Sequence, residues 1–233
     1  RRVLGADHEE TLVAANDLGA FLSELGEFTE AETLLRETYE TRRRLHGEAS
    51  PLMQEVLANL AELLSRTGKP KEAEELYRSA LKALAADKEA SPLAVLSTKS
   101  MLARNLIKLY GRADQDRLTE AEGLLQESYD GLCRLVGENH WESLQALRFL
   151  ADADYERDQI GAAKEKYELL LARQVEALGP EHASTLETKQ SLARVAEKQG
   201  KMEDAERLYR ELVDIQTRVR GSAHPDTIVA VNN

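Results

Sequence analysis

The sequence is poor in cysteine, in aromatic residues and in long apolar runs, and each shortage excludes a class of structure. A single cysteine, Cys133, rules out an internal disulfide and a zinc site built from cysteines. Because this fits a reducing compartment, we expect a cytoplasmic protein. No apolar run approaches the roughly 20 residues that span a bilayer, and the N-terminus lacks the residue order of a signal peptide, so we expect no membrane insertion.

Positive charge is also in short supply. The chain carries 31 Lys and Arg against 42 Asp and Glu, a formal net charge of -11 at pH 7. The resulting field repels phosphate backbones, so we expect no nucleic acid partner. What the sequence does have is 42% hydrophobic and 31% charged residues, unusually charged for one compact domain. It begins at Arg1 without methionine and ends at Asn233 inside a predicted helix, so we expect a piece of a longer protein.

A short pattern of glycine, two variable residues and histidine recurs and defines an internal period. It begins at Gly5, Gly137, Gly179 and Gly221, and the last three copies are 42 residues apart. Gly47 follows Gly5 by another 42 residues in a copy without the histidine. The period predicts a single array with repeats at 5–46, 47–88, 89–136, 137–178 and 179–220, then the first helix of a truncated sixth repeat at 221–233.

Recurring landmarks inside each period predict two helices per repeat. A leucine followed by a small residue marks the first helix: Leu18-Gly19, Leu60-Ala61, Leu102-Ala103, Leu150-Ala151 and Leu192-Ala193. An alanine marks the second: Ala31, Ala73, Ala121, Ala163 and Ala205. Glycines that can end a helix stand between the two: Gly26, Gly68, Gly111 and Gly200. No alternating run reaches strand length, so the predicted class is all-α.

The apolar spacing of the second helix in the first repeat shows which side chains it buries. Ala31, Leu34, Leu35, Thr38 and Leu45 fall on one face at helical spacing. Glu30, Glu37, Arg42 and Arg43 fall outside this face.

The third repeat is six residues longer than the others. The extra residues fall near 111–119, between its two helices, because only the spacing from the first helix to the second is enlarged. They predict either a loop insertion or an extension of the neighbouring helices. An insertion on one face of an array is a candidate recognition feature, and neutral drift of a surface loop is the alternative.

The landmarks resemble the tetratricopeptide signature. The matching segments are Leu18-Gly19, Ala73-x-x-x-Tyr77, Ala163-x-x-x-Tyr167 and Ala205-x-x-x-Tyr209. The 42-residue period and the opening Leu-Gly-Pro-Glu-His at 178–182 closely resemble kinesin light chain repeats, and similar repeats occur in arrays attached to signalling ATPases. The resemblance covers the whole chain and implies a right-handed superhelical solenoid of helix-turn-helix repeats whose first helices line a concave groove.

In that family the groove receives an extended peptide, often acidic with a tryptophan, held partly by paired asparagines. Asn232 and Asn233 match such a pair, and Asn16 and Asn59 each match half of one. The third to fifth repeats depart from the pattern with Ser100-Met101, Arg148-Phe149 and Gln190-Ser191. The lysine-then-asparagine clamp by which some tetratricopeptide domains hold chaperone C-termini is not matched.

Counting from the leucine landmark predicts which other side chains line the groove. The later repeats gather positive and aromatic groups there: Arg104, Lys108, Arg148, Phe149, Tyr155, Arg194 and Lys198. Guanidinium groups beside aromatic rings can hold an acidic peptide that carries an apolar anchor. The alternative is a solvated face neutralised by carboxylates, the candidates being Glu62, Asp152, Glu187 and Glu197.

The remaining candidates for chemistry are better explained as scaffold. His8, His140, His182 and His224 stand at equivalent places in four repeats, too far apart to share a metal ion. We expect them to be helix caps or packing residues, because a second helix ends there and its free carbonyls can accept hydrogen bonds. Recurring Glu-Ala-Glu triplets suit the positive end of the helix dipole. No phosphate-binding loop, nucleophile elbow or metalloprotease motif occurs.

These observations predict a non-catalytic, adaptor-like scaffold that binds a peptide segment or a partner protein in its groove, without metal or cofactor. Two alternatives stay open. The first is a structural assembly subunit, which a large apolar patch on the convex side or a stable oligomer would favour. The second is the sensor arm of a larger signalling ATPase, which flanking sequence would separate from an adaptor.

Overall fold

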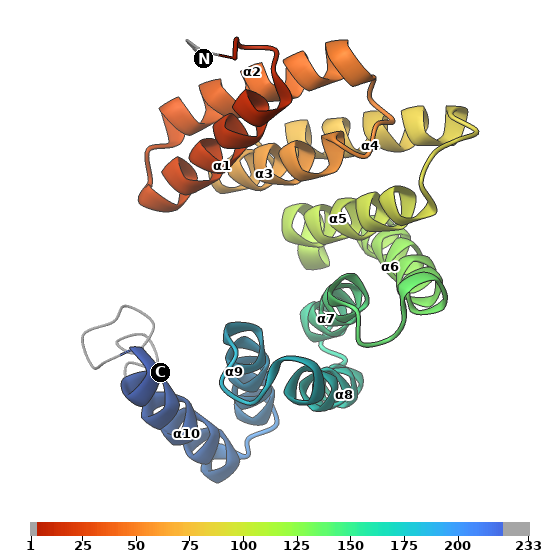
Figure 1. The fold of residues 1–233 in the computed structure, drawn as a ribbon. Coiled ribbons are helices and arrows are strands. Elements are labelled where there is room, and N and C mark those ends of the chain that lie inside the picture. The colour runs from red at the N-terminus through yellow and green to blue at the C-terminus, as the bar shows by residue number, and fades with distance from the viewer. Residues whose placement is uncertain (1–3, 221–233) are drawn as a thin grey trace. The chain divides into compact units, whose positions relative to one another are not determined.

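The computed structural model describes residues 4–220, apart from the side chains of Arg112, Val219 and Arg220 (Figure 1). This part is helical and has no strand: α1 (Glu9–Leu25), α2 (Phe28–His46), α3 (Met53–Arg66), α4 (Pro70–Ala86), α5 (Pro92–Tyr110), the 3-10 turn η1 (Gly111–Ala113), α6 (Gln115–Val136), α7 (Trp141–Glu156), α8 (Ile160–Leu178), α9 (Ala183–Lys198) and α10 (Met202–Arg220). The all-α prediction is confirmed. The predicted sixth repeat, with His224, Asn232 and Asn233, lies outside the described residues.

The chain forms two compact units, Arg1–Ser128 (unit 1) and Tyr129–Asn233 (unit 2). In unit 1, α1 to α5 pack consecutively, each against the next, and the first helices α1, α3 and α5 also touch in sequence. In unit 2, α7 to α10 pack consecutively in the same way. Contacts between neighbours in the sequence are typical of helix-turn-helix arrays, in which a core grows repeat by repeat. The repeat boundaries stay a prediction, and two helices lie within each of the five ranges.

Left-handed backbone conformations end the first helices, as the glycines predicted. Gly26, Gly68 and Gly200 have φ angles of 86°, 78° and 73°. The fourth repeat has no glycine there, and Asp158, 42 residues before Gly200, takes the left-handed conformation with φ 64°. Aspartate tolerates this conformation better than most side chains because it is short and polar. Pro70 is the first residue of α4, where its missing N–H leaves no hydrogen bond unmade.

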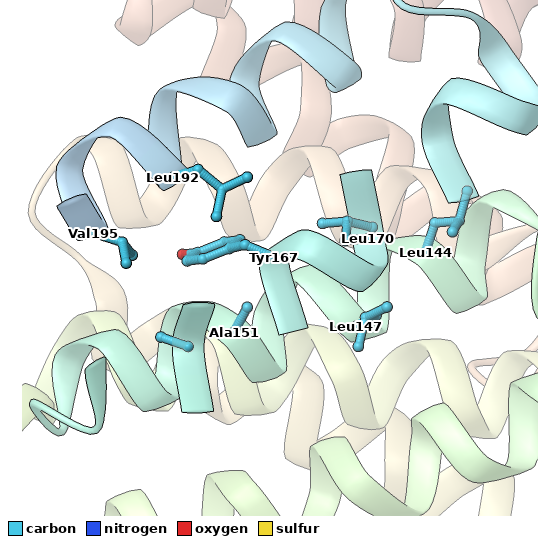
Figure 2. Close-up of a cluster of buried hydrophobic side chains, with 8 residues drawn as sticks. Leu144, Leu147, Ala151, Tyr167, Leu170, Leu192 and Val195 are labelled. Atoms are coloured by element: carbon cyan, nitrogen blue, oxygen red, sulfur yellow. The ribbon is translucent and has the colours of Figure 1, made fainter. Parts of the chain in front are cut away.

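Small landmark residues allow the two helices of a repeat to approach closely. A Cβ on Gly19 would stand 2.7 Å from Cγ of Leu35, too close for van der Waals contact. The equivalent alanines of the other repeats are buried. In unit 2 the core joins Leu147 and Ala151 of α7 to Tyr167 of α8, with Val195 of α9 closing it (Figure 2).

The six extra residues of the third repeat extend helices rather than forming a long loop. α5 continues to Tyr110, η1 adds one tight turn, and α6 begins at Gln115. Asp114 precedes α6, and its carboxylate accepts a hydrogen bond of 3.1 Å from the backbone N–H of Arg117. The hydroxyl of Tyr110 donates to Glu74 of α4 at 3.0 Å. Of the two predicted outcomes, the structure shows the helix extension.

Two placements on α2 are wrong: Leu45, predicted on the buried face, is 40% exposed, and Arg42, predicted outside that face, is buried. Its side chain is 2% exposed, and its guanidinium donates to Glu9 Oε1 at 2.7 Å and to the carbonyl of Leu52 at 2.9 Å. The physical reason is that the second helix of a repeat contacts neighbouring helices on two sides. Residues near its C-terminus are therefore buried even when they lie outside the main apolar face. Leu84, 42 residues later in α4, is buried at the same register.

Candidate functional site

The predicted groove residues of unit 1 lie on first helices that are joined by side-chain hydrogen bonds. Nδ2 of Asn59 donates to Oδ1 of Asn16 at 3.0 Å. Asn16 is completely buried and Asn59 is half-buried, so the expectation that Asn16 lines the groove with an exposed side chain is wrong. Asn16 belongs to the buried stripe of α1 with Leu12 and Gly19, and its own Nδ2 has no partner among the described residues.

Further polar bonds between first helices were not predicted. Arg66 of α3 donates to Ser23 of α1 at 3.0 Å and lies over the ring of Phe28. Ser65 donates to Asn105 of α5 at 2.9 Å. The sequence does carry a signal for these bonds: their polar residues stand about one period apart, as Asn16 and Asn59 do. This network fixes the spacing of successive first helices in unit 1.

Arg104 and Lys108 of α5 share one carboxylate. Arg104 donates to Glu62 Oε2 at 2.7 Å, and Lys108 donates to Oε1 of the same group at 3.1 Å. Burial by itself would raise the pKa of Glu62, but attraction to the two cations outweighs burial and holds that pKa below its ordinary value.

In unit 2, two cations of α9 lie over an aromatic ring of α7. The guanidinium carbon of Arg194 is 5.2 Å from the ring centroid of Tyr155, and Nζ of Lys198 is 5.7 Å from it. Tyr155 is half-buried and both cations are exposed. Lys198 also reaches Asp158 at 3.5 Å. Within the described part of the chain, no carboxylate lies within 4.0 Å of the Arg194 guanidinium. We call Tyr155, Arg194 and Lys198 the aromatic-cation cluster.

Arg148, about two turns before Tyr155 on α7, is held by carboxylates. Its guanidinium lies 2.5 Å from Glu187 of α9 and 4.0 Å from Asp152, four residues further along its own helix. Asp152 also accepts a hydrogen bond from the hydroxyl of Tyr167. Burial raises the pKa of Tyr167, and the negative charge of Asp152 raises it further. Carboxylates therefore neutralise Arg148, as the alternative prediction has it, but the described residues place none within ion-pair distance of Arg194.

The prediction that Phe149 lines the groove is wrong, because its side chain is only 5% exposed. Phe149 lies with Ala146 and Ala153 on a second buried stripe of α7, three or four residues apart. A helix inside a repeat array is buried on more than one face. Counting from the leucine landmark therefore predicts only one buried face, and residues of the second buried face are wrongly predicted to be exposed.

The repeated histidines begin helices instead of ending them. Nδ1 of His8 accepts from the backbone N–H of Glu10 at 3.3 Å, and Nδ1 of His182 accepts from Ser184 at 3.2 Å. His140 takes the same N-cap position at α7 without this bond, its Nδ1 lying 3.2 Å from Glu142. The expected capping role is confirmed for His8 and His182, but the expected partner is wrong: these side chains accept from free N–H groups of the next helix and do not donate to carbonyls of the preceding one.

Across residues 4–220, no three His, Cys, Asp or Glu side chains gather in a way that would hold a metal ion. Among the helices of that range, none combines the length and the apolar character needed to cross a bilayer.

Comparison with known proteins gives matches in family models and in solved structures. One tetratricopeptide repeat model matches residues 10–86 and 146–218, and a second matches residues 113–142. No match was found among curated proteins. The family models therefore cover more than half of the chain.

The solved structures are similar in fold at low sequence identity. Nearly identical repeats from a Podosopora anserina protein assigned as a kinesin light chain align at 24% identity over 91% of this chain and 98% of that one, with a TM-score of 0.63. BtubC (BKLC) from P. vanneervenii aligns at 24% identity over 93% and 82%, with a TM-score of 0.68. A Rap protein complexed with Competence and Sporulation Factor aligns at 15% identity over 87% and 53%, with a TM-score of 0.69.

Three findings agree: a 42-residue period, two helices for each period, and family models that match both units. The expected repeat type is confirmed at the level of fold by the kinesin-light-chain-like structures. The chain belongs to the tetratricopeptide repeat family.

Proposed function

We propose that this chain is a non-catalytic interaction scaffold and that the aromatic-cation cluster of unit 2 binds an acidic segment of a partner protein. The observation that carries the proposal is the exposed Arg194 over Tyr155, with no carboxylate within ion-pair distance in the described part of the chain. An arginine guanidinium binds a carboxylate through two parallel hydrogen bonds, so a glutamate or aspartate of the partner fits this group.

The half-buried ring of Tyr155 supplies the apolar part of the site. An aromatic or aliphatic side chain next to the partner's carboxylate can pack beside this ring, because Tyr155 offers a flat apolar surface at low conformational cost. The carboxylates that hold Lys198 and Arg148 are themselves exposed, with Asp158 at 60% and Glu187 at 53% exposure. Exposed ion pairs contribute only ~0–1 kcal/mol, so a partner carboxylate can replace them at small cost.

In unit 1, the side chains of Arg104 and Lys108 are proposed as a second contact for acidic residues. Both side chains are more than 40% exposed. Asn59 lies on a neighbouring first helix and is half-buried. Asn16 is assigned to the scaffold, because its side chain is buried and bonded to Asn59. The Rap protein complexed with Competence and Sporulation Factor is one example of this fold holding a factor.

The proposal is tested with a library of fluorescently labelled acidic peptides, each with one aromatic residue, measured by anisotropy. The variant Arg194→Glu is expected to weaken the binding of the selected peptides tenfold or more, about 1.4 kcal/mol, because one charge-assisted contact becomes a repulsion. The matched control Arg207→Glu makes the same charge change on α10, where Arg207 is 63% exposed. Equal affinities in the two variants, or no binding by any acidic peptide, would refute the proposal.

A further inference from the structure

Ion pairs join the second helices α2 and α4 of unit 1 at two levels. At the first level, Lys69, the residue before α4, lies 2.8 Å from Glu32 of α2. At the second level, one helical turn further along α2, Arg36 lies 2.7 Å from Glu72 of α4. The two side chains of α2 are four residues apart, so they lie on one face of their helix. Each is met by a side chain of opposite charge from the next second helix.

The same two levels are paired between α4 and α6. At the first level, Arg117 of α6 lies 3.9 Å from Glu74 of α4. At the second level, Arg78 of α4 lies 2.9 Å from Glu120 of α6. In unit 1, a second helix with glutamate and, four residues later, arginine therefore meets a cation and then a carboxylate of the following second helix.

Between α8 and α10 of unit 2, residues of like charge occupy both levels. Three periods further along the chain, the first level holds Lys164 and Lys201, and the second holds Glu168 and Asp204. Lys164 lies 3.3 Å from Glu168 of its own helix, α8. Asp204 lies 3.2 Å from Arg207, also of its own helix, α10. Within residues 4–220, no ion pair joins α8 to α10 at either level.

A hollow of about 230 Å³ lies where these ion pairs are missing, and the four residues of the two levels line it. Its two carboxylates are each 55% exposed, so a partner can reach them. α9 contacts both α8 and α10 (Figure 1) and contributes to the apolar part of the lining. The leucine and valine side chains of this lining are Leu171, Leu192, Val195 and Leu208. We call the hollow and the four charged residues of its two levels the α8–α10 cleft.

We propose that the α8–α10 cleft binds a helix of a partner protein that carries a glutamate and, four residues later, an arginine. The partner's glutamate pairs with Lys164 and Lys201, and its arginine pairs with Glu168 and Asp204. These are the charges that α2 presents to α4 in unit 1. The two partner groups lie about 5–6 Å apart on one face of their helix, which matches two levels that are one helical turn apart.

The remaining features of the cleft suit the same partner. A leucine three residues after the partner's glutamate lies on the same face of the partner helix and can reach the apolar lining. The ion pairs within α8 and within α10 are exposed and therefore weak, so charges of the partner can replace them. The cleft is built entirely from residues that the structure describes. The inference goes beyond the proposed function and uses none of its binding residues.

Three fluorescently labelled, hydrocarbon-stapled peptide helices of equal length test the proposal by anisotropy. The probe carries glutamate, leucine and arginine at positions i, i+3 and i+4, and the two comparison peptides carry either glutamate or arginine at both charged positions. At physiological ionic strength, where distant charges are screened, the probe is expected to bind the whole chain at least tenfold more tightly than either comparison peptide. The reason is that each comparison peptide meets a like charge at one of the two levels. Equal affinities for the three peptides, or no saturable binding of the probe, would overturn the proposal.

A charge exchange on α10 shows whether the probe binds at the cleft. The variant Lys201→Glu with Asp204→Lys keeps the net charge and gives both levels opposite charges, as in unit 1. It is expected to weaken binding of the probe tenfold or more while the helical circular dichroism stays unchanged, because the two charges of α8 then pair across the cleft. The control Lys71→Glu with Glu75→Lys makes the same exchange at exposed positions of α4 and is expected to bind like the wild type. Undiminished binding by the α10 variant would overturn the proposal, whatever the acidic-peptide experiment shows.

Discussion

At the scale of single residues, the least favourable backbone conformation belongs to Asp158. It has φ 64° where three other repeats use glycine. Because a side chain in the left-handed region strains the backbone, Asp158→Gly is expected to raise the free energy of unfolding by up to about 1 kcal/mol. The 3.5 Å contact to Lys198 is exposed and contributes little. Urea unfolding measures the change. The reverse substitution, Gly200→Asp, is expected to destabilise the chain, and equal midpoints for both variants would contradict the explanation.

Arg42 gives a second prediction at this scale. Arg42→Ala removes two hydrogen bonds and leaves a hole among buried neighbours, so a loss of about 3 kcal/mol in the free energy of unfolding is expected. Arg42→Leu is expected to lose less than half as much, because Leu84 and Leu132 occupy the equivalent register of α4 and α6 and are buried. Thermal unfolding of both variants distinguishes a packing role from an electrostatic one. If leucine is as damaging as alanine, the bond to Glu9 is what matters at this position.

Arg42 and Phe149, two of the residues that sequence reasoning misplaced, share one physical cause. Helical periodicity locates a single apolar face, and Arg42 and Phe149 lie outside that face. Helices of a repeat array are packed on two sides, so residues beside the main stripe are also buried. The glycine positions were predictable because a left-handed turn needs a particular residue. The left-handed conformation of Asp158 was not predicted, because the fourth repeat has aspartate and not glycine at this turn.

At the scale of helices, the extended third repeat depends on the start of α6. Asp114 accepts a hydrogen bond from the backbone N–H of Arg117, one of the N–H groups that the helix itself leaves free. Asp114→Ala is expected to cost about 1 kcal/mol and to increase amide exchange in the first turn of α6. Asp116→Ala, two residues later, is the control. Unchanged exchange in Asp114→Ala would show that this cap does not hold the turn.

The pairing of helices was predictable from the period, whereas the ion pairs between them were not. Aligning repeats places Arg36 and Arg78 at one register and Glu72 and Glu120 at another. Whether these side chains meet depends on the offset between neighbouring helices, which the sequence of one repeat does not contain. For Arg104, the sequence left open a basic groove or neutralisation by a carboxylate such as Glu62, and the structure shows that Arg104 and Lys108 share the carboxylate of Glu62.

At the scale of the whole molecule, unit 1 holds three carboxylates whose pKa values are lowered by cations of neighbouring helices. A hydrogen bond from Lys69 lowers the pKa of Glu32, and one from Arg78 lowers the pKa of Glu120. For Glu62, burial acts in the opposite direction and is outweighed by Arg104 and Lys108. All three groups join successive repeats, so their ionisation is coupled to the packing of unit 1.

The sign of this coupling predicts how unit 1 responds to acid. A carboxylate with a lower pKa in the folded than in the unfolded chain stabilises the fold fully above its unfolded pKa of about 4.5, and this stabilisation is lost as the pH falls through the folded pKa. Amide exchange from about pH 6 to about pH 3 is therefore expected to show falling protection in α2 to α6. The double variant Glu32→Gln with Glu120→Gln should make this loss of protection shallower, because neither side chain then binds a proton. The control Glu75→Gln removes an exposed carboxylate that has no cation within ion-pair distance in the described part of the chain, and it should leave the loss unchanged. A double variant as acid-sensitive as the wild type would place the acid response elsewhere than in these inter-repeat pairs.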